Sequence, residues 1–207
     1  MSPATKQART GKKSPGRKKT ATVRSQFERY VGQLRTLYRE ADRILSMSPP
    51  ATDAELVDLE RQLGWLVPSP LRSAWLVANG GEAYSPVFAR PGRLTGHDFL
   101  SVEQALAECE SLRRRAPSYE GYEEPDPRGT RIKEGWYQPG WLPFAGFGGG
   151  SLLLMIDVTP GSAGTIGQVI SYTHDPDQIE FVAASFEEFL ERSAEAIAVD
   201  ANEYLLT

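Results

Sequence analysis

The side chains that most often carry catalysis are few in this chain and lie far apart along it. His97 and His174 are its two histidines, and neither has a cysteine or a second histidine at the spacing of a metal site. His174 precedes Asp175, as in half of a general-base pair, but Pro176 and Asp177 follow and predict a turn in which the histidine pairs locally with an aspartate. The sequence therefore predicts neither a catalytic residue nor a metal site.

Cys109 and a glycine-rich run are two further features with a chemical interpretation. Cys109 lies on the apolar side of a predicted helix, where a small buried side chain is more common than a nucleophile. Residues 146–150 lack the Gly-Lys-Ser/Thr ending of a phosphate loop and lead into a predicted strand, so no helix N-terminus is offered to an anion. We interpret the run as a turn. We expect no cofactor, no small-molecule substrate and no enzymatic activity.

The remaining candidate site is a predicted long surface loop, residues 116–135, together with the aromatic residues that lead from it into the sheet. Trp136 and Tyr137 are flanked by Gly135 and Pro139, and they are either exposed contact anchors or parts of the core. The acidic residues of the segment are Glu120, Glu123, Glu124, Asp126 and Glu134. An acidic loop that bears aromatic residues suits a positively charged protein partner, such as a nuclease. The alternative is a solvated insertion that contacts nothing.

Charge is divided unevenly between the N-terminus and the rest of the chain. The first 24 residues hold eight basic and no acidic residues, whereas the rest holds 15 basic and all 27 acidic residues, a net charge of −12. Residues 1–22 contain too few apolar side chains to order themselves, so we predict a disordered basic tail. Its clustered cations are Lys12, Lys13, Arg17, Lys18 and Lys19. They suit weak contact with nucleic acid or a nuclear-import-like signal, and the alternative is a tail that only aids solubility.

The composition of the chain indicates the cellular compartment in which we expect the protein to act. A chain of 207 residues with 40% hydrophobic residues can bury one substantial core. Its single cysteine cannot form an intramolecular disulfide, so nothing requires an oxidising compartment. No run approaches the roughly 18 apolar residues of a membrane span, and no apolar segment follows the basic N-terminal residues. We expect a soluble cytoplasmic protein that does not act at a membrane.

Helices are predicted where residues that favour helix ends flank amphipathic stretches. The first spans residues 23–46, in which apolar side chains recur at helical spacing. Thr52 and Glu55 form a predicted capping box for a second helix, which Gly64 would end in the left-handed conformation. Ser69 is the predicted N-cap of a third helix.

Three further signals complete the helical prediction. Residues 79–81, Asn-Gly-Gly, are expected to close the third helix with a glycine at positive φ. Ser101 with Gln104, and Ser185 with Glu188, open two more helices. An arginine run ends the first of these, where the helix dipole favours positive charge, so the run requires no ligand.

The sheet is predicted around residues 139–173. Residues 151–157 hold five consecutive apolar residues between turn signals, which predicts a strand buried on both faces, and residues 168–173 are its antiparallel partner. An edge strand is expected at residues 87–88 and a last strand at residues 179–183. Because helices and strands are grouped and do not alternate, we predict one α+β domain, residues 23–207, with a mostly antiparallel sheet of about four to six strands flanked by helices.

Four stretches, in this order, resemble the SUKH superfamily. ATDAELVDLERQLGWLVPSPLRSAWLVANGG is similar to its signature, in which an acidic helix leads through a glycine, a proline and an apolar helix to an Asn-Gly-Gly turn. WLPFAGFGGGSLLLMIDVTPGSAGTIGQVI and SFEEFL resemble its sheet and final helix. The resemblance covers about residues 48–198. The helix before Pro49 resembles the extension of members similar to fungal cell-wall-assembly and killer-toxin-resistance regulators.

The resemblance implies an α+β domain without known catalysis. Such domains in bacteria are often immunity proteins that bind and neutralise a cognate polymorphic toxin, and in fungi they are signalling scaffolds. No partner-binding residue carries over from the family. The first hypothesis is therefore an immunity protein that binds a toxin directly, the toxin being basic and of the nuclease kind. The alternative is a scaffold or regulator whose basic tail contacts nucleic acid or an acidic partner.

Overall fold

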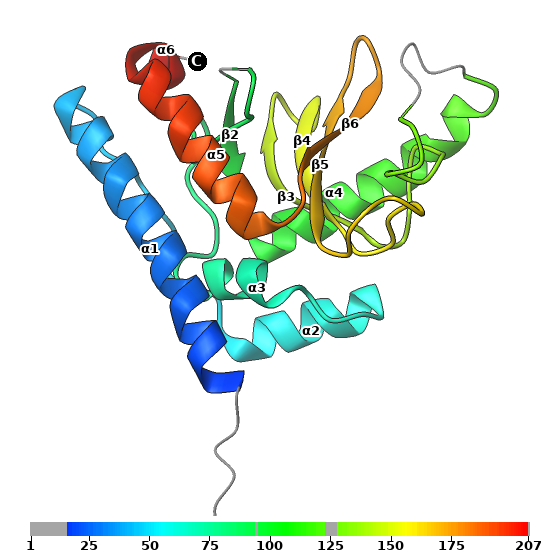
Figure 1. Cartoon of the computed structure of the whole chain (residues 1–207), viewed down its shortest axis with the longest axis horizontal. Coiled ribbons are helices and arrows are strands. Elements are labelled where there is room, and N and C mark those ends of the chain that lie inside the picture. The colour runs from blue at the N-terminus through cyan, green and yellow to red at the C-terminus, as the bar shows by residue number, and fades with distance from the viewer. Residues whose placement is uncertain (1–15, 94, 123–127, 207) are drawn as a thin grey trace, which may run out of the picture.

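The computed structural model describes residues 16–93, 95–122 and 128–206 as one α+β domain (Figure 1). Its helices are α1 Gly16–Glu40, α2 Asp53–Leu63, α3 Ser69–Trp75, α4 Val102–Arg115, the short 3₁₀ helix η1 Ala116–Tyr119, α5 Phe186–Val199 and α6 Ala201–Leu206. None of the helices in the described part of the chain combines the length and apolar character that crossing a bilayer requires. The division into a basic tail, residues 1–22, and a body stays a prediction.

Six strands form one antiparallel sheet in which each strand pairs with the next along the chain. The strands are β1 Phe88–Ala89, β2 Gly96–Phe99, β3 Trp141–Phe147, β4 Leu152–Asp157, β5 Gln168–Thr173 and β6 Gln178–Ala183. The predicted hairpin is the β4–β5 pair, the predicted edge strand is β1, and the predicted last strand is β6, so these three expectations are confirmed. The whole of α4 and η1 is inserted between β2 and β3, which hydrogen-bond side by side.

Both faces of the sheet are covered, and β4 shows this most clearly. Leu154 and Ile156 join a core between the sheet and the helices α1, α3 and α5, which lie together on one side of the molecule (Figure 1). Leu153 and Met155 point the other way and join a second cluster beneath α4 and the chain that follows it. Alternate side chains of a strand face opposite sides of its sheet, so a continuous apolar run is required here.

Packing of the first core depends on aromatic rings. Phe88 of β1 lies at their centre, with Phe99 and Phe144 edge-on at centroid distances of 5.4 and 5.6 Å. Phe27 of α1 and Phe189 of α5 pack on the same ring at 6.3 and 5.5 Å. Edge-on and tilted pairs are the favoured aromatic geometries. These contacts bind both long helices to the edge of the sheet.

Several predicted helix ends are found, but the predicted start of α3 is wrong. Thr52 and Ser101 each form the predicted capping box, Ser185 accepts from the backbone of Glu188, and Gly64 ends α2 at φ 77°. Ser69, however, lies inside α3: the N-cap is the preceding proline, which has no side chain that can accept a hydrogen bond. Pro70 follows Ser69 in the first turn of α3, and because proline has no backbone N–H, that turn has one fewer donor to satisfy.

The first helix differs from the predicted residues 23–46 at both ends, since α1 begins at Gly16 and ends at Glu40. Its end is set by Asp42, which adopts φ 54°, while the N–H of Arg43 donates to the carbonyl of Tyr38 at 2.8 Å. This reversal brings Leu45 back into the core. The apolar periodicity therefore continued past the helix because the next segment also contacts the core.

Residues 79–81 do not cap α3, so that expectation is wrong. The helix ends at Trp75, and its C-cap residue, Leu76, is right-handed. Gly80 does adopt φ 92°, but a Cβ atom there would lie only 2.7 Å from the backbone nitrogen of Ser101. Glycine is therefore required by a close approach to the start of α4 as well as by its own backbone conformation.

Asn79 and Gly80 instead join three segments. The side-chain Oδ1 of Asn79 accepts from the N–H of Val102 at 2.9 Å, at the start of α4. The N–H of Asn79 donates to Pro49 at 2.9 Å, and the carbonyl of Gly80 accepts from Ser48 at 3.0 Å. The turn thereby holds the connection between α1 and α2 against α4.

Candidate protein-interaction surface

The predicted acidic segment lies at the end of α4, and the structure separates its members. Glu120 and Glu134 are exposed, whereas Tyr137 is half-buried. Glu123, Glu124 and Asp126 lie outside the described residues, as do Lys12 and Lys13 of the basic N-terminus. Arg17, Lys18 and Lys19 belong to the first turns of α1. The two described carboxylates of the segment are therefore accessible to a partner, while Tyr137 is only partly so.

Trp136 is a core residue, so its interpretation as an exposed anchor is wrong. Only 7% of its surface is exposed. Its ring stacks on Tyr119 at a centroid distance of 4.6 Å, and the guanidinium of Arg128 lies 4.9 Å from its centre. Tyr122 meets the same ring edge-on at 5.6 Å but is 45% exposed. Tyr122 is therefore the accessible ring of this cluster, and no signal in the sequence distinguishes it from Tyr119.

A polar network holds η1 against the far end of the sheet. Oδ1 of Asp177 lies 2.8 Å from the hydroxyl of Tyr119, 3.1 Å from that of Tyr172 and 2.8 Å from Nδ1 of His174. Partial burial would raise the pKa of the Asp177 carboxyl, but these hydrogen bonds outweigh it and the pKa is lowered. His174 thus pairs locally, as predicted, although with Asp177 and not with Asp175. The spacing of three residues within a turn was the available signal.

Of the other two chemically notable side chains, His97 is buried and Cys109 is half-buried. Burial raises the pKa of the Cys109 thiol to about 12, and its sulfur lies 3.5 Å from the carbonyl of Trp141. Burial also lowers the pKa of His97 to about 4 and outweighs the opposing hydrogen bond to the carbonyl of Thr95, while the charge of Arg90 adds a smaller lowering. The thiol is therefore protonated and the imidazole neutral at pH 7. Among the described residues, no three His, Cys, Asp or Glu side chains gather as metal ligands would.

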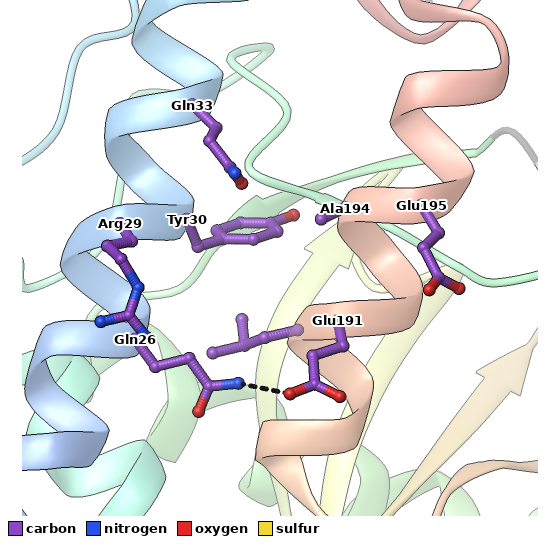
Figure 2. A pocket seen from close by; sticks show the side chains of 8 residues that line it. Gln26, Arg29, Tyr30, Gln33, Glu191, Ala194 and Glu195 are labelled. Carbon is purple, nitrogen blue, oxygen red and sulfur yellow. Dashed lines mark hydrogen bonds between the residues drawn. The ribbon is translucent and has the colours of Figure 1, made fainter.

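A hollow of about 310 Å³ lies between α1 and α5 (Figure 2). Tyr30 points from α1 toward α5, where its hydroxyl donates to the carbonyl of Val87 at 2.7 Å and lies 2.7 Å from Oγ of Ser193. Gln26 spans the hollow to Oε1 of Glu191 at 3.3 Å (Figure 2). These polar groups are engaged in holding the two helices together, so we assign this hollow a packing role.

The structure thus defines a class: a single α+β domain on a six-stranded antiparallel sheet, with exposed carboxylates beside a buried aromatic cluster. The model of the SMI1/KNR4 family (SUKH-1) matches residues 50–192, which is more than half of the chain. The chain belongs to this family, and the resemblance to the SUKH superfamily is confirmed.

One similar protein is the "Cell wall biosynthesis/cell cycle regulator smi1" of Schizosaccharomyces pombe. The alignment is 30% identical over 154 positions, and it covers 68% of this chain and 29% of the relative. The chain therefore spans less than a third of that relative's length.

Proposed function

We propose that the chain is a non-catalytic protein-binding module that acts in the cytoplasm as an immunity protein and neutralises a cognate polymorphic toxin by direct binding. The observation that carries this proposal is the charge of residues 25–207, which hold 27 acidic and 15 basic residues. A toxin that acts on nucleic acid needs a positively charged surface, and an acidic module is complementary to it.

Electrostatic complementarity supports fast encounter, and aromatic contacts support affinity. Opposite net charges raise the association rate and make it fall with ionic strength. The energy of a protein interface, in contrast, comes mainly from a few anchors, among which tyrosine is enriched. Tyr122, with Glu120 and Glu134 in the same segment, offers both features on one exposed part of the molecule.

Co-expression with the product of the neighbouring gene tests the proposal. The chain is expected to restore growth and to form a complex that dissociates at high salt. A Glu120→Lys/Glu134→Lys double variant should lose rescue, whereas Glu195→Lys/Glu203→Lys, which changes two exposed carboxylates on α5 and α6, should retain it. Rescue by both variants would place the interface elsewhere. If the wild-type chain neither restores growth nor forms a complex, the immunity role is contradicted.

The second candidate is a scaffold or regulator, which the name of the S. pombe relative favours. In this role the basic N-terminus would contact nucleic acid or an acidic partner. Labelled double-stranded DNA should then bind the full chain in a salt-dependent manner, and removal of residues 1–21 should abolish binding. Equal binding by both forms would contradict a role for the N-terminal cations.

A further inference from the structure

A second hollow, of about 300 Å³, opens on the side of the sheet where β2, α4 and the β3–β4 turn meet. Its walls include Tyr84, Asp98, Gln104, Glu108 and the glycine turn of residues 148–150. Two of these residues are carboxylates that lie ten positions apart on different elements, β2 and α4. The hollow is separate from the acidic segment that follows α4.

Asp98 brings an uncompensated negative charge to this hollow. Its Oδ2 accepts from the N–H of Tyr84 at 2.9 Å, while Oδ1 is buried and has no hydrogen-bond partner in the described part of the chain. Burial raises the pKa of this carboxyl against the opposing backbone hydrogen bonds from Tyr84 and Ser85. Among described residues Asp98 makes no ion pair, so its charge is stabilised only by neutral groups.

Glu108 supplies the second carboxylate and is half-buried. It lies against the glycine turn: a Cβ atom on Gly150 would come 2.7 Å from its Oε2. No described residue forms a hydrogen bond or an ion pair with its carboxylate. The glycine at this position therefore leaves room for a carboxylate that has no cation beside it.

The rim of the hollow provides an aromatic ring and an open backbone. Tyr84 is 77% exposed although it is a large aromatic residue, and it adopts φ 61°. The turn opposite consists of three glycines at φ 62°, 63° and 84°. Because these residues lack side chains, an incoming group can approach both the backbone carbonyls of the turn and the carboxylates.

We propose that this hollow receives an arginine side chain of the positively charged protein partner. A guanidinium group has five N–H donors in one plane, binds carboxylates and carbonyls together, and stacks on an aromatic ring such as that of Tyr84. It also supplies the positive charge that Asp98 and Glu108 lack. The inference rests on the proposed function for the identity of the partner, but the hollow can be tested without that partner.

The test uses the full ¹⁵N-labelled chain and a capped Gly-Arg-Gly peptide, with Gly-citrulline-Gly as the uncharged control of the same shape. The arginine peptide should shift the amide resonances of Tyr84, Asp98 and residues 148–150, and the citrulline peptide should not. Asp98→Asn and Glu108→Gln keep the size of the side chain and should each weaken binding on the order of ten-fold. Glu195→Gln, on α5, should leave affinity unchanged.

Two results of the peptide experiment would overturn the inference: no shifts at these positions, or equal shifts with both peptides. Thermal unfolding of each variant separates lost binding from lost structure. Capture of the neighbouring gene product, measured separately, tests the proposed function. A complex that Asp98→Asn and Glu108→Gln do not weaken would overturn the hollow as its docking point and leave the immunity role standing. Peptide binding without capture would support the hollow and contradict the immunity role.

Discussion

Individual buried side chains decide how the stability of the fold responds to pH and to the removal of a side chain. The sequence predicts no functional role for His97 and makes Trp136 a candidate contact residue, and both are enclosed: 2% and 7% of their surfaces are exposed. For each, the immediate environment explains the residue type. His97 places Nδ1 3.0 Å from the carbonyl of Thr95, and Trp136 is held between Tyr119 and Arg128.

Replacement of His97 by glutamine should remove part of the acid sensitivity of the fold. Because the pKa is about 4 in the folded state and about 6.5 when unfolded, the unfolded chain binds more protons between these values. Stability from the neutral imidazole is fully present above about pH 6.5 and is lost as pH falls toward 4, by roughly 3 kcal/mol. Urea unfolding from pH 7 to pH 4 should show a shallower decline for His97→Gln, and parallel curves would contradict this explanation.

Truncation of Trp136 to alanine should lower the free energy of unfolding by about 3–5 kcal/mol, the usual cost of removing a large buried ring. The matched variant is Tyr122→Ala, which removes a ring from the same stack that is already 45% exposed and should cost clearly less. Urea denaturation of both proteins measures the difference. Equal losses would show that Trp136 contributes no more to the core than a surface residue.

At the scale of elements, the turn of residues 79–81 joins three segments that are distant in sequence. It contacts the start of α4 through Asn79 and Gly80, and Gly81 donates to the carbonyl of Phe99 at 2.9 Å. An isolated bridge also pairs Gly81 with Met47. The connection after α1, the end of β2 and the start of α4 are therefore held by three consecutive residues.

Gly80→Ala tests this role. Two effects should lower the free energy of unfolding of this variant. Alanine at a positive φ costs about 1–2 kcal/mol, and a Cβ atom 2.7 Å from the backbone costs about 1–3 kcal/mol through overpacking. The control is Gly121→Ala, where φ is 79° but nothing lies within 4 Å, so only the first cost applies. Chemical denaturation should show the larger loss for Gly80→Ala. The same loss at both positions would mean that the close approach to Ser101 relaxes without cost.

At the scale of the whole molecule, opposite charges are kept apart along the chain. Eight cations precede residue 25, and the net charge after it is −12. The described core contacts of α1 begin at Phe27 and continue through Tyr30, Val31 and Leu34. The described side chains that join α1 to the core therefore lie from Phe27 onward.

Deletion of residues 1–21 should leave the thermal midpoint of unfolding unchanged within error. The deletion removes the first six residues of α1, 16–21. The side chains that the structure places in the core begin at Phe27, after the deleted part. Differential scanning calorimetry of the full and shortened chains makes the comparison. A loss of several degrees would show that the N-terminus packs on the domain.

The sequence by itself determined the features that depend on neighbours within a few residues. Two capping boxes, the left-handed Gly64 and the β4–β5 hairpin follow from side chains that act on adjacent backbone, and the apolar run of β4 determined that both faces of the sheet are buried. Their order was sufficient for the α+β class and for the family.

Only the tertiary structure decided which side chains remain available to a partner. Trp136 is buried because η1 places Tyr119 on its ring, and Gly80 is constrained because Ser101 passes close to it. Asp98 and Glu108 line one hollow because the β3–β4 turn comes back beside β2 and α4. Burial and close approach are set by segments that are distant in sequence, and a local pattern of residue types does not specify them.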